Sequence, residues 1–177
     1  MNGQLLQIAL IGNPILRQKA KTVTDFNDIH IQSLIDDLLA TVTDVHGVGI
    51  SAPQVYQSYR IFIVASHPNP RYPNAPIMTP TPIINPKIIS HSNTVVKDWE
   101  GCLSIPGIRG RIPRYTEIDV AYTDRNGKPV QHTYTDFIAR IFQHENDHLD
   151  GILFLDRVEH NTEIISDKEY LKLLNEK

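Results

Sequence analysis

The residues with the clearest capacity for chemistry are His144, Glu145 and His148, which form the pattern H-E-x-x-H. On a helix, two histidines four residues apart project from the same face, about one turn from each other. Two imidazoles at this spacing can bind one metal ion. Glu145 then lies next to the ion but outside the ligand set, where it can serve as a general base that activates water. The pattern therefore indicates a metal-dependent hydrolase.

The sequence on either side of this motif predicts the helix that it needs. We expect Asp136 to be the N-cap and Gly151 to end the helix. Apolar residues recur at helical spacing around the motif: Phe137, Ile138, Ile141, Phe142, Leu149 and Ile152. A surface helix that carries two histidines and a glutamate by chance is the alternative, but it leaves these apolar residues unexplained. We expect a buried helix whose polar side chains have partners, because unpaired buried polar groups are costly.

A third ligand is required, and Cys102 is the strongest candidate. A lone cysteine is more often a small buried hydrophobic residue than a ligand. The extended pattern H-E-x-x-H-x-x-G-x-x-H would supply a third histidine downstream, but Phe154 stands at that position. The other downstream histidine and carboxylates do not follow this spacing. We therefore expect the third ligand upstream, at the only cysteine in the chain.

A glycine-bearing segment, residues 47–54, has the sequence G-V-G-I-S-A-P-Q. On its own it is a simple connection between a helix and a strand, and it lacks the glycine spacing of a dinucleotide-binding loop. Its small residues would also let the backbone of a ligand approach closely. Gln54 is the side chain in this segment that could then donate a hydrogen bond to the ligand.

The composition limits the classes of function. A chain of 177 residues with a net charge of −3 predicts one domain and gives no electrostatic signal for nucleic acid or an anionic membrane. One cysteine excludes an intramolecular disulfide. We find no basic signal-peptide segment at the start and no apolar run near the length of a membrane span. We therefore expect a cytoplasmic protein.

The remaining elements must position these residues. The clearest amphipathic helix begins after Asp25 or Asn27 and ends at Gly47, and we expect a purely structural role for it. Residues 61–65 predict a buried strand. The proline-rich stretch 67–82 predicts a long loop that could border the site, because proline is excluded from helices and central strands.

Further strands are expected beyond this loop. Short strand segments are predicted at 83–84, 88–89 and 94–96, and residues 100–114 are expected to be irregular. Alternating residues around 118–121 and 130–135 predict two strands joined by an Asn126-Gly127 hairpin turn.

Three separated motifs together resemble the peptide deformylase family: G-V-G-I-S-A-P-Q at 47–54, E-G-C-L-S at 100–104 and Q-H-E-N-D-H-L-D-G at 143–151. The resemblance covers nearly the whole chain to about Arg157. It implies an α+β fold with mixed or antiparallel sheets packed around a central metal-binding helix. We expect one catalytic domain at 1–158 and a polar tail at 159–177, with a short helix from Thr162 to Leu174.

The resemblance also implies an activity. The family removes the N-formyl group from the N-terminal formylmethionine of newly made polypeptides and releases formate. The implied cofactor is one Fe²⁺ per chain, for which Ni²⁺, Co²⁺ or Zn²⁺ can substitute. The implied partners are N-formylmethionyl peptides of nascent chains, met near the ribosome.

Residue roles follow from the positions that match the family motifs. Cys102, His144 and His148 match the metal ligands, and Glu145 matches the catalytic acid and base. Gln54 and the backbone N–H of Leu103 match the donors to the developing oxyanion. The expected substrate-binding residues are Val48, Gly49, Glu100, Gly101, Phe137, Arg140 and Ile141. Ser51 replaces a usual alanine, and the proline-rich loop is longer than in the shortest members.

Two arginines carry separate hypotheses. We expect Arg114 to pair with Glu100 and so to hold Cys102 in place, rather than to be a solvated surface charge. Arg140 stands on a helix face that is mostly apolar in the resembled family. We expect its methylene chain to cover the wall of the methionine pocket while its guanidinium reaches water at the mouth. The alternative is that Arg140 turns away and pairs with a surface carboxylate.

Two other functions remain open on the residues alone. A zinc endopeptidase would share the chemistry, but Cys102 as ligand and Gln54 as donor argue against it. A non-catalytic peptide-binding protein could keep the metal for structure, but such a site needs neither Glu145 nor Gln54.

Overall fold

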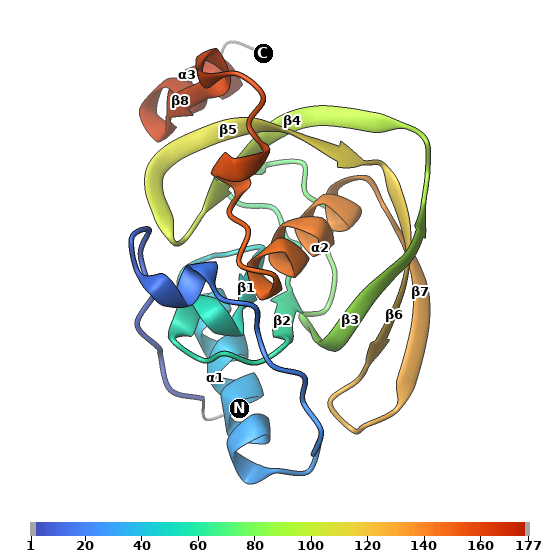
Figure 1. Ribbon diagram of the computed structural model, residues 1–177. Coiled ribbons are helices and arrows are strands. Elements are labelled where there is room, and N and C mark those ends of the chain that lie inside the picture. The colour runs from blue at the N-terminus through green and yellow to red at the C-terminus, as the bar shows by residue number, and fades with distance from the viewer. Residues whose placement is uncertain (1–2, 176–177) are drawn as a thin grey trace.

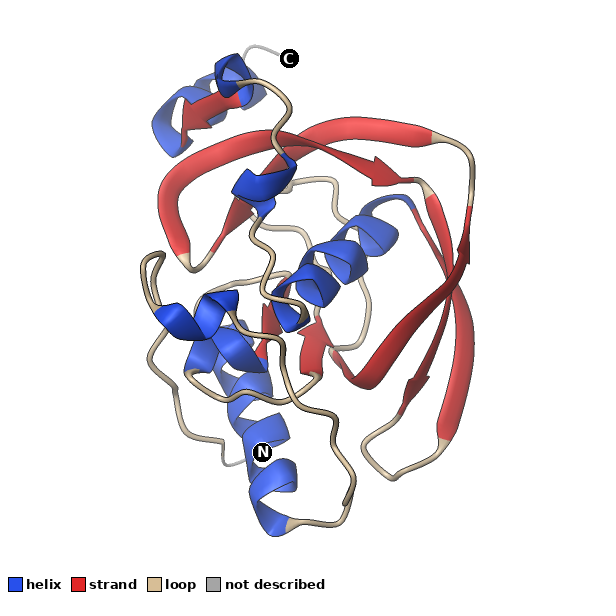
Figure 2. Cartoon of the chain, in the orientation of Figure 1, coloured by secondary structure: helices blue, strands red, loops and turns tan. Residues whose placement is uncertain are grey.

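The computed structural model describes residues 3–175 and has α2 (Asp136–Leu149) near its centre, between two antiparallel sheets (Figures 1 and 2). The larger sheet has the order β1-β2-β3-β6-β7 and the smaller one the order β4-β5-β8. The predicted α+β class with antiparallel sheets is therefore confirmed. No helix within residues 3–175 combines the length and the apolar character needed to span a membrane.

The strands of the larger sheet are β1 (Gly49–Ser51), β2 (Ile61–Val64), β3 (Thr81–His91), β6 (Glu117–Thr123) and β7 (Pro129–Thr135). The smaller sheet consists of β4 (Val95–Cys102), β5 (Ile105–Tyr115) and β8 (Ile164–Ser166). The helices besides α2 are α1 (Ile29–Asp44) and α3 (Asp167–Asn175), with short 3-10 turns at 14–17, 52–55, 154–157 and 161–163.

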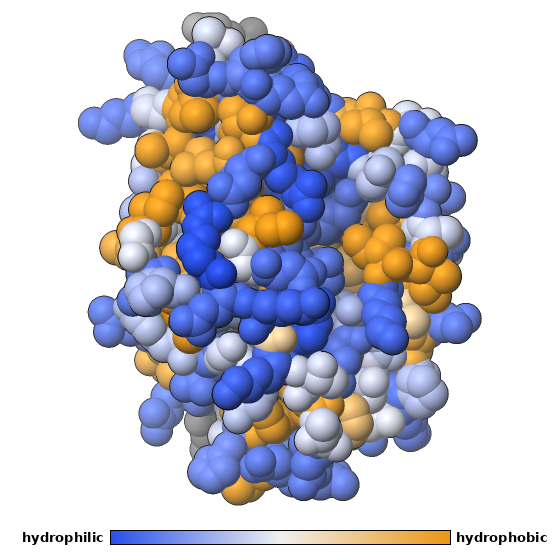
Figure 3. Space-filling view, viewed as in Figure 1, coloured by the Kyte–Doolittle hydropathy of each residue, from blue (hydrophilic) through white to orange (hydrophobic). Residues whose placement is uncertain are grey.

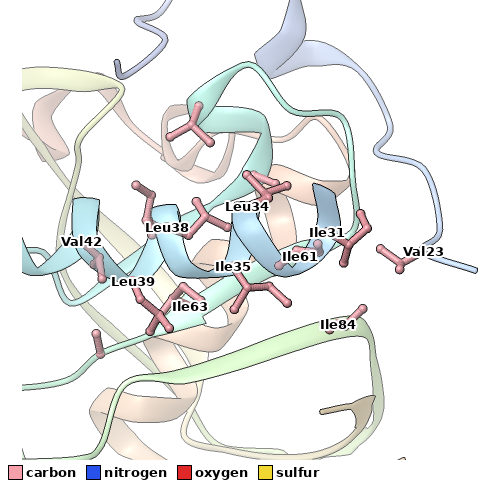
Figure 4. Packing of buried hydrophobic residues seen from close by; sticks show 14 residues of the cluster. Val23, Ile31, Leu34, Ile35, Leu38, Leu39, Val42, Ile61, Ile63 and Ile84 are labelled. Carbon is pink, nitrogen blue, oxygen red and sulfur yellow. The ribbon is translucent and has the colours of Figure 1, made fainter. Parts of the chain in front are cut away.

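The amphipathic helix α1 packs its apolar face on the larger sheet. Ile35, Leu38 and Val42 are fully buried and lie beside Ile61 and Ile63 of β2 (Figure 4). The N-cap is Asp28, whose side chain accepts from the His30 N–H, so the predicted caps Asp25 and Asn27 are wrong. Asp25 instead accepts from the Asn27 N–H in the preceding turn. The packing of α1 positions β1, which starts five residues after the helix ends.

One long strand, β3, replaces the short segments predicted at 83–84 and 88–89. Asn85 adopts a left-handed φ of +50°, and the register shifts between Ile84 and Lys87. The strand therefore passes Pro86 through a bulge, which is where a sheet tolerates proline. Pro82 also lies in β3, so the loop is shorter than predicted. Pro82 pairs with Ile63 of β2 on one side of the strand. On the other side, pairing with β6 begins only at Ile84, so that side of β3 is unpaired at Pro82.

Residues 100–114, predicted to be irregular, belong to the hairpin of β4 and β5. Glu100 pairs with Gly110, and Cys102 pairs with Ile105 across a tight turn. Glycines and prolines in this stretch hid its strand character, because both residues are uncommon in strand interiors. The predicted hairpin between β6 and β7 is confirmed, with Gly127 at a φ of +79°. The β4–β5 hairpin gives Cys102 a rigid support.

The segment after residue 158 is part of the packed structure. Strand β8 adds to the edge of β5, with Ile164 opposite Gly110. The helix that follows begins at Asp167, five residues later than the predicted cap Thr162, because residues 164–166 pair as a strand first. Apolar side chains gather on the visible face over β5 and this segment (Figure 3). Residues 176–177 of the predicted tail lie outside the described residues.

Candidate metal centre

The fold brings Cys102, His144 and His148 together. Both histidines lie on one face of α2, and Cys102 is the last residue of β4. One ligand atom from each residue lies within 4.8 Å of the others, and Cys102 Sγ is 3.3 Å from His148 Nε2. Within residues 3–175 this is the only group of three or more His, Cys, Asp and Glu side chains that could hold a metal ion.

The start of α2 differs from the prediction, although its end agrees with it. Strand β7 continues to Thr135, and the Asp136 N–H bonds the Thr116 carbonyl across the sheet at 2.7 Å. Asp136 is the first helical residue, with a φ of +49°, so it is not the N-cap. Gly151 follows the last turn with a φ of +73°, as a helix stop does. The direct passage from strand to helix ties α2 to the larger sheet.

His144 is oriented by Glu100. Its Nδ1 lies 2.8 Å from Glu100 Oε2, which leaves Nε2 to face Cys102. Burial alone would raise the pKa of Glu100, but the Arg114 charge and the hydrogen bond from His144 lower it well below its usual range. The ionised carboxylate accepts the Nδ1 proton, so the Nε2 lone pair is free for a metal.

The donor set fits one divalent cation. Burial lowers the pKa of His148 well below its usual value, which keeps this imidazole neutral as a ligand must be. Burial also opposes a charge on His144, yet Cys102 and Glu100 raise its pKa well above normal. Groups that stabilise a positive charge at this position also stabilise a bound metal cation. One sulfur and two imidazole nitrogens suit iron, nickel, cobalt or zinc rather than calcium or magnesium.

Gln54 is held with its amide N–H groups toward the centre. Its oxygen accepts from the Ser51 N–H at 2.9 Å and from the Ser51 hydroxyl at 3.1 Å. Its Nε2 lies 3.4 Å from Cys102 Sγ and 3.2 Å from Ser104 Oγ. Ser51 thus contributes a hydrogen bond that an alanine could not make. A donor fixed in this way can stabilise negative charge that develops beside it.

Glu145 is the buried acid of the site. It is 4% exposed, and its Oε2 has no hydrogen-bond partner among the described residues. Burial raises its pKa to about 7, which suits a group that accepts and returns a proton near neutral pH. A Cβ at Gly49 would lie 2.5 Å from Glu145 Oε1 and 2.9 Å from Ile141 Cγ2. A side chain at position 49 would therefore displace the Glu145 carboxylate or Ile141.

A cavity of about 200 Å³ opens beside these groups. Every residue predicted to bind substrate contributes to its lining: Val48, Gly49, Glu100, Gly101, Phe137, Arg140 and Ile141. Cys102, Leu103, His144, Glu145 and Gln54 line it as well. The predicted acid, donors and substrate-binding residues therefore share one cavity with two of the predicted ligands, Cys102 and His144.

A family model described as polypeptide deformylase matches residues 5–163 of the chain. The chain belongs to this family. The family consists of metal-dependent hydrolases that remove the N-formyl group from the N-terminal methionine of newly made polypeptides. The family resemblance predicted from three motifs is confirmed, and so is the predicted activity.

Relatives and solved structures agree with the family match. A peptide deformylase 2 of Nostoc sp. (strain PCC 7120) is 62% identical over 174 residues, covering 98% of this chain and 97% of the relative. A peptide deformylase 2 of Shewanella oneidensis is 47% identical over 152 residues, covering 86% of this chain and 83% of the relative. The Met-Ala-Ser-bound crystal structure of a class I type b deformylase from Acinetobacter baumannii has a TM-score of 0.86 at 43% identity, covering 88% of this chain and 99% of that one.

Arg140 lines the cavity as predicted, but the prediction for its guanidinium is wrong. Its guanidinium turns away from the mouth of the cavity and is buried, with the side chain 9% exposed. Nη1 donates to Glu100 Oε1 and to the Ile112 carbonyl, each at 2.8 Å, and Nη2 donates to the Val96 carbonyl at 2.6 Å. A buried carboxylate and two carbonyls compensate the charge better than the cavity mouth would. The alternative of a surface carboxylate also fails, because Glu100 is 3% exposed.

The Glu100–Arg114 pair is confirmed. Arg114 donates from Nε to Glu100 Oε1 at 2.9 Å and from Nη2 to Oε2 at 3.0 Å, while Nη1 reaches Asp147 at 2.6 Å. Because both carboxylate oxygens of Glu100 are bonded by protein groups, its contribution to the cavity is to hold His144. The pair therefore acts on the metal ligand through Glu100.

Several residues that line the cavity were not predicted from the sequence, and four of them have polar side chains: Arg71, Tyr72, Arg109 and Asp167. The expectation that the proline-rich loop borders the site is confirmed by Arg71 and Tyr72, which had not been predicted individually. Arg109 is 2% exposed and donates to Asp167 at 2.7 Å and to the Tyr72 hydroxyl at 3.1 Å. Nothing in the local sequence indicates contacts between residues so far apart in the chain.

Proposed function

We propose that Cys102, His144 and His148 hold one Fe²⁺ per chain in this deformylase, and that Ni²⁺, Co²⁺ or Zn²⁺ can take its place. The convergence of a thiol and two imidazoles beside the unpaired carboxylate oxygen of Glu145 carries this proposal. When bound, the ion supplies Lewis acidity that polarises the formyl group and makes water more acidic. Glu145 and Gln54 are left free of the ligand set for the chemistry.

Glu145 moves the proton in the proposed reaction. Its Oε2 accepts a proton from the water that adds to the formyl carbon, and the new C–O bond places negative charge on the former carbonyl oxygen. The Gln54 amide and the Leu103 N–H donate to that oxygen. When the C–N bond breaks, Glu145 returns the proton to the departing amine, and formate leaves. The carboxyl is then ready for another cycle.

The substrate is an N-formylmethionyl peptide of a nascent chain. We assign the backbone of Val48 and Gly49 to pairing with the peptide, because the missing side chain at Gly49 allows close approach. The methionine side chain lies against Gly101, Phe137 and Ile141, with the methylene chain of Arg140 beyond them. The A. baumannii deformylase has been solved with Met-Ala-Ser bound, which supports a peptide in the corresponding cavity here. We place the catalytic residues within the expected catalytic domain, 1–158, which residues 164–175 complete, and we place the reaction in the cytoplasm, near the ribosome.

Formate release from formyl-Met-Ala-Ser by anaerobically prepared protein tests the function. Casein cleavage and the metal content per chain are measured on the same preparation. Formate release without casein cleavage, at one metal per chain, is expected. Casein cleavage would favour an endopeptidase, and bound metal with neither activity would favour a peptide-binding protein. Cys102→Ser should lower both the metal content and formate release.

A further inference from the structure

A second cavity, of about 530 Å³, lies next to the substrate cavity. We call it the outer pocket. Its walls come from four parts of the fold: residues 71–75, Asp98 and Trp99 of β4, Phe137 at the start of α2, and Tyr170, Leu173 and Leu174 of α3. Arg71, Tyr72 and Phe137 line both cavities, so the outer pocket continues from the substrate cavity. The α3 wall lies beyond residue 163, where the family match ends.

The interior of the outer pocket is aromatic and aliphatic. The ring centroids of Tyr72 and Phe137 lie 5.0 Å apart, and those of Trp99 and Tyr170 lie 6.3 Å apart. Asn74 and Asp98 in its walls are exposed to solvent, whereas the polar groups of Arg71, Tyr72 and Tyr170 have protein partners. The Tyr170 hydroxyl donates to the Arg71 carbonyl at 3.1 Å, and Arg71 Nη2 donates to the His46 carbonyl at 2.7 Å. The outer pocket therefore favours an apolar side chain over a polar or charged group.

Contacts across the fold hold these walls in place. The guanidinium of Arg109 lies 4.2 Å from the ring centroid of Tyr170 and 5.2 Å from that of Tyr72. Arg109 also bonds Asp167 at the start of α3 and the Tyr72 hydroxyl. One arginine thus joins the proline-rich loop to the C-terminal helix. A pocket formed before binding loses less entropy when a ligand enters.

We propose that the outer pocket binds an apolar side chain of the substrate polypeptide, from a residue downstream of the formylmethionine. This rests on the proposed function, which places the formyl group beside Cys102, His144 and Glu145. A polypeptide fixed there at its first residue continues outward along the cavity. The shared residues Tyr72 and Phe137 lie where the cavity meets the outer pocket, within reach of the following residues. Deformylation should therefore depend on sequence beyond the methionine.

Leu173 and Leu171 provide a matched pair of variants on α3. They are 43% and 41% exposed, and Leu173 lines the outer pocket whereas Leu171 lies outside its lining. The metal-loaded wild type, Leu173→Asp and Leu171→Asp are each assayed with formyl-Met-Ala-Ser. They are also assayed with formyl-Met pentapeptides of serine and alanine in which one leucine occupies position two, three, four or five. Emission from Trp99, the only tryptophan of the chain, reports binding of the same peptides.

Leucine at one position should raise kcat/KM about tenfold in the wild type and in Leu171→Asp, a gain typical of filling an apolar pocket. The gain and the Trp99 response should be lost in Leu173→Asp. All three proteins should deformylate formyl-Met-Ala-Ser at the same rate. The proposal is overturned if no position gives a gain, or if the gain survives Leu173→Asp. It is also overturned if Leu173→Asp lowers activity on formyl-Met-Ala-Ser, because the outer pocket would then act on the first residues or on folding.

The same experiment separates this proposal from the function beneath it. A wild type that released no formate from any formyl peptide would contradict the proposed function. The Trp99 titration would still test the outer pocket in that case, since it measures binding without turnover. A leucine-dependent Trp99 response that disappears in Leu173→Asp and persists in Leu171→Asp supports the pocket. An identical response in all three proteins contradicts it.

Discussion

Arg140 and Arg114 donate to the same carboxylate oxygen, Oε1 of Glu100, at 2.8 and 2.9 Å. The other oxygen accepts from Arg114 and lies 2.8 Å from His144 Nδ1. Two guanidinium groups and one imidazole therefore meet at one buried carboxylate. Because a buried ion is costly without compensation, removal of either arginine should disturb the metal ligand as well as the fold.

Replacing Arg114 should lower the stability of the protein more than replacing Arg140 does. Arg114→Ala removes the bidentate partner of Glu100 and one partner of Asp147, which leaves buried charge poorly compensated. We expect a loss of about 3–5 kcal/mol in the free energy of unfolding. We also expect weaker metal retention, measured by competition with a chelator. Arg157→Ala, which removes a half-exposed partner of Asp147 alone, is the control. Equal metal retention in Arg114→Ala and the wild type would contradict the role of the pair.

Arg140→Met should weaken the protein without changing its choice of substrate. The substitution keeps the methylene chain along the cavity but removes the hydrogen bonds to Glu100, Val96 and Ile112, and we expect it to cost about 2–3 kcal/mol. Because the guanidinium is directed away from the cavity mouth, it should not attract an acidic residue after the formylmethionine. The ratio of kcat/KM for formyl-Met-Asp peptides to kcat/KM for formyl-Met-Lys peptides is measured at low salt. It should be the same in the wild type and in Arg140→Met. A ratio that falls in Arg140→Met would show that the guanidinium reaches the substrate.

Glu145→Ala should separate metal binding from turnover. Glu145 lies outside the ligand set, so the variant should retain close to one metal per chain. Without the group that moves the proton, kcat should fall by at least about 10²–10⁴-fold. The loss should appear in kcat rather than in KM, because the group acts in the transition state. Metal analysis beside steady-state kinetics checks both points, and a parallel loss of metal would assign Glu145 a structural role.

The identity of the ion should determine the response to air. A thiolate beside Fe²⁺ is open to oxidation, whereas Ni²⁺ does not readily supply the electron that starts this damage. We expect the iron form to lose activity under oxygen and the nickel form to keep it. The half-lives of the two forms, prepared anaerobically from one batch of apoprotein, provide the measurement. Equal half-lives would contradict an oxygen-sensitive iron–thiolate centre.

Several features of this protein were determined by sequence over short distances. The repeat of apolar residues predicted α1 and α2, the spacing of His144 and His148 placed both on one face, and Asn126-Gly127 predicted the hairpin between β6 and β7. These signals depend on periodicity and turn chemistry within a few residues, so they can be interpreted without the fold. The three family motifs extended this to Cys102, which lies 42 and 46 positions before the two histidines.

Only the tertiary structure decided which partners the long and charged side chains have. Arg140 has several donors on a flexible chain, and its partner Glu100 lies 40 positions away on β4. The same holds for Arg109, whose partner Asp167 lies 58 positions away. It also holds for β8, whose pairing with β5 turned an expected tail into part of a sheet. A local pattern can predict that a charge will be buried or a strand will form. Which group compensates the charge, and which strand pairs with the new one, depends on the distant segments that the packed core brings into contact.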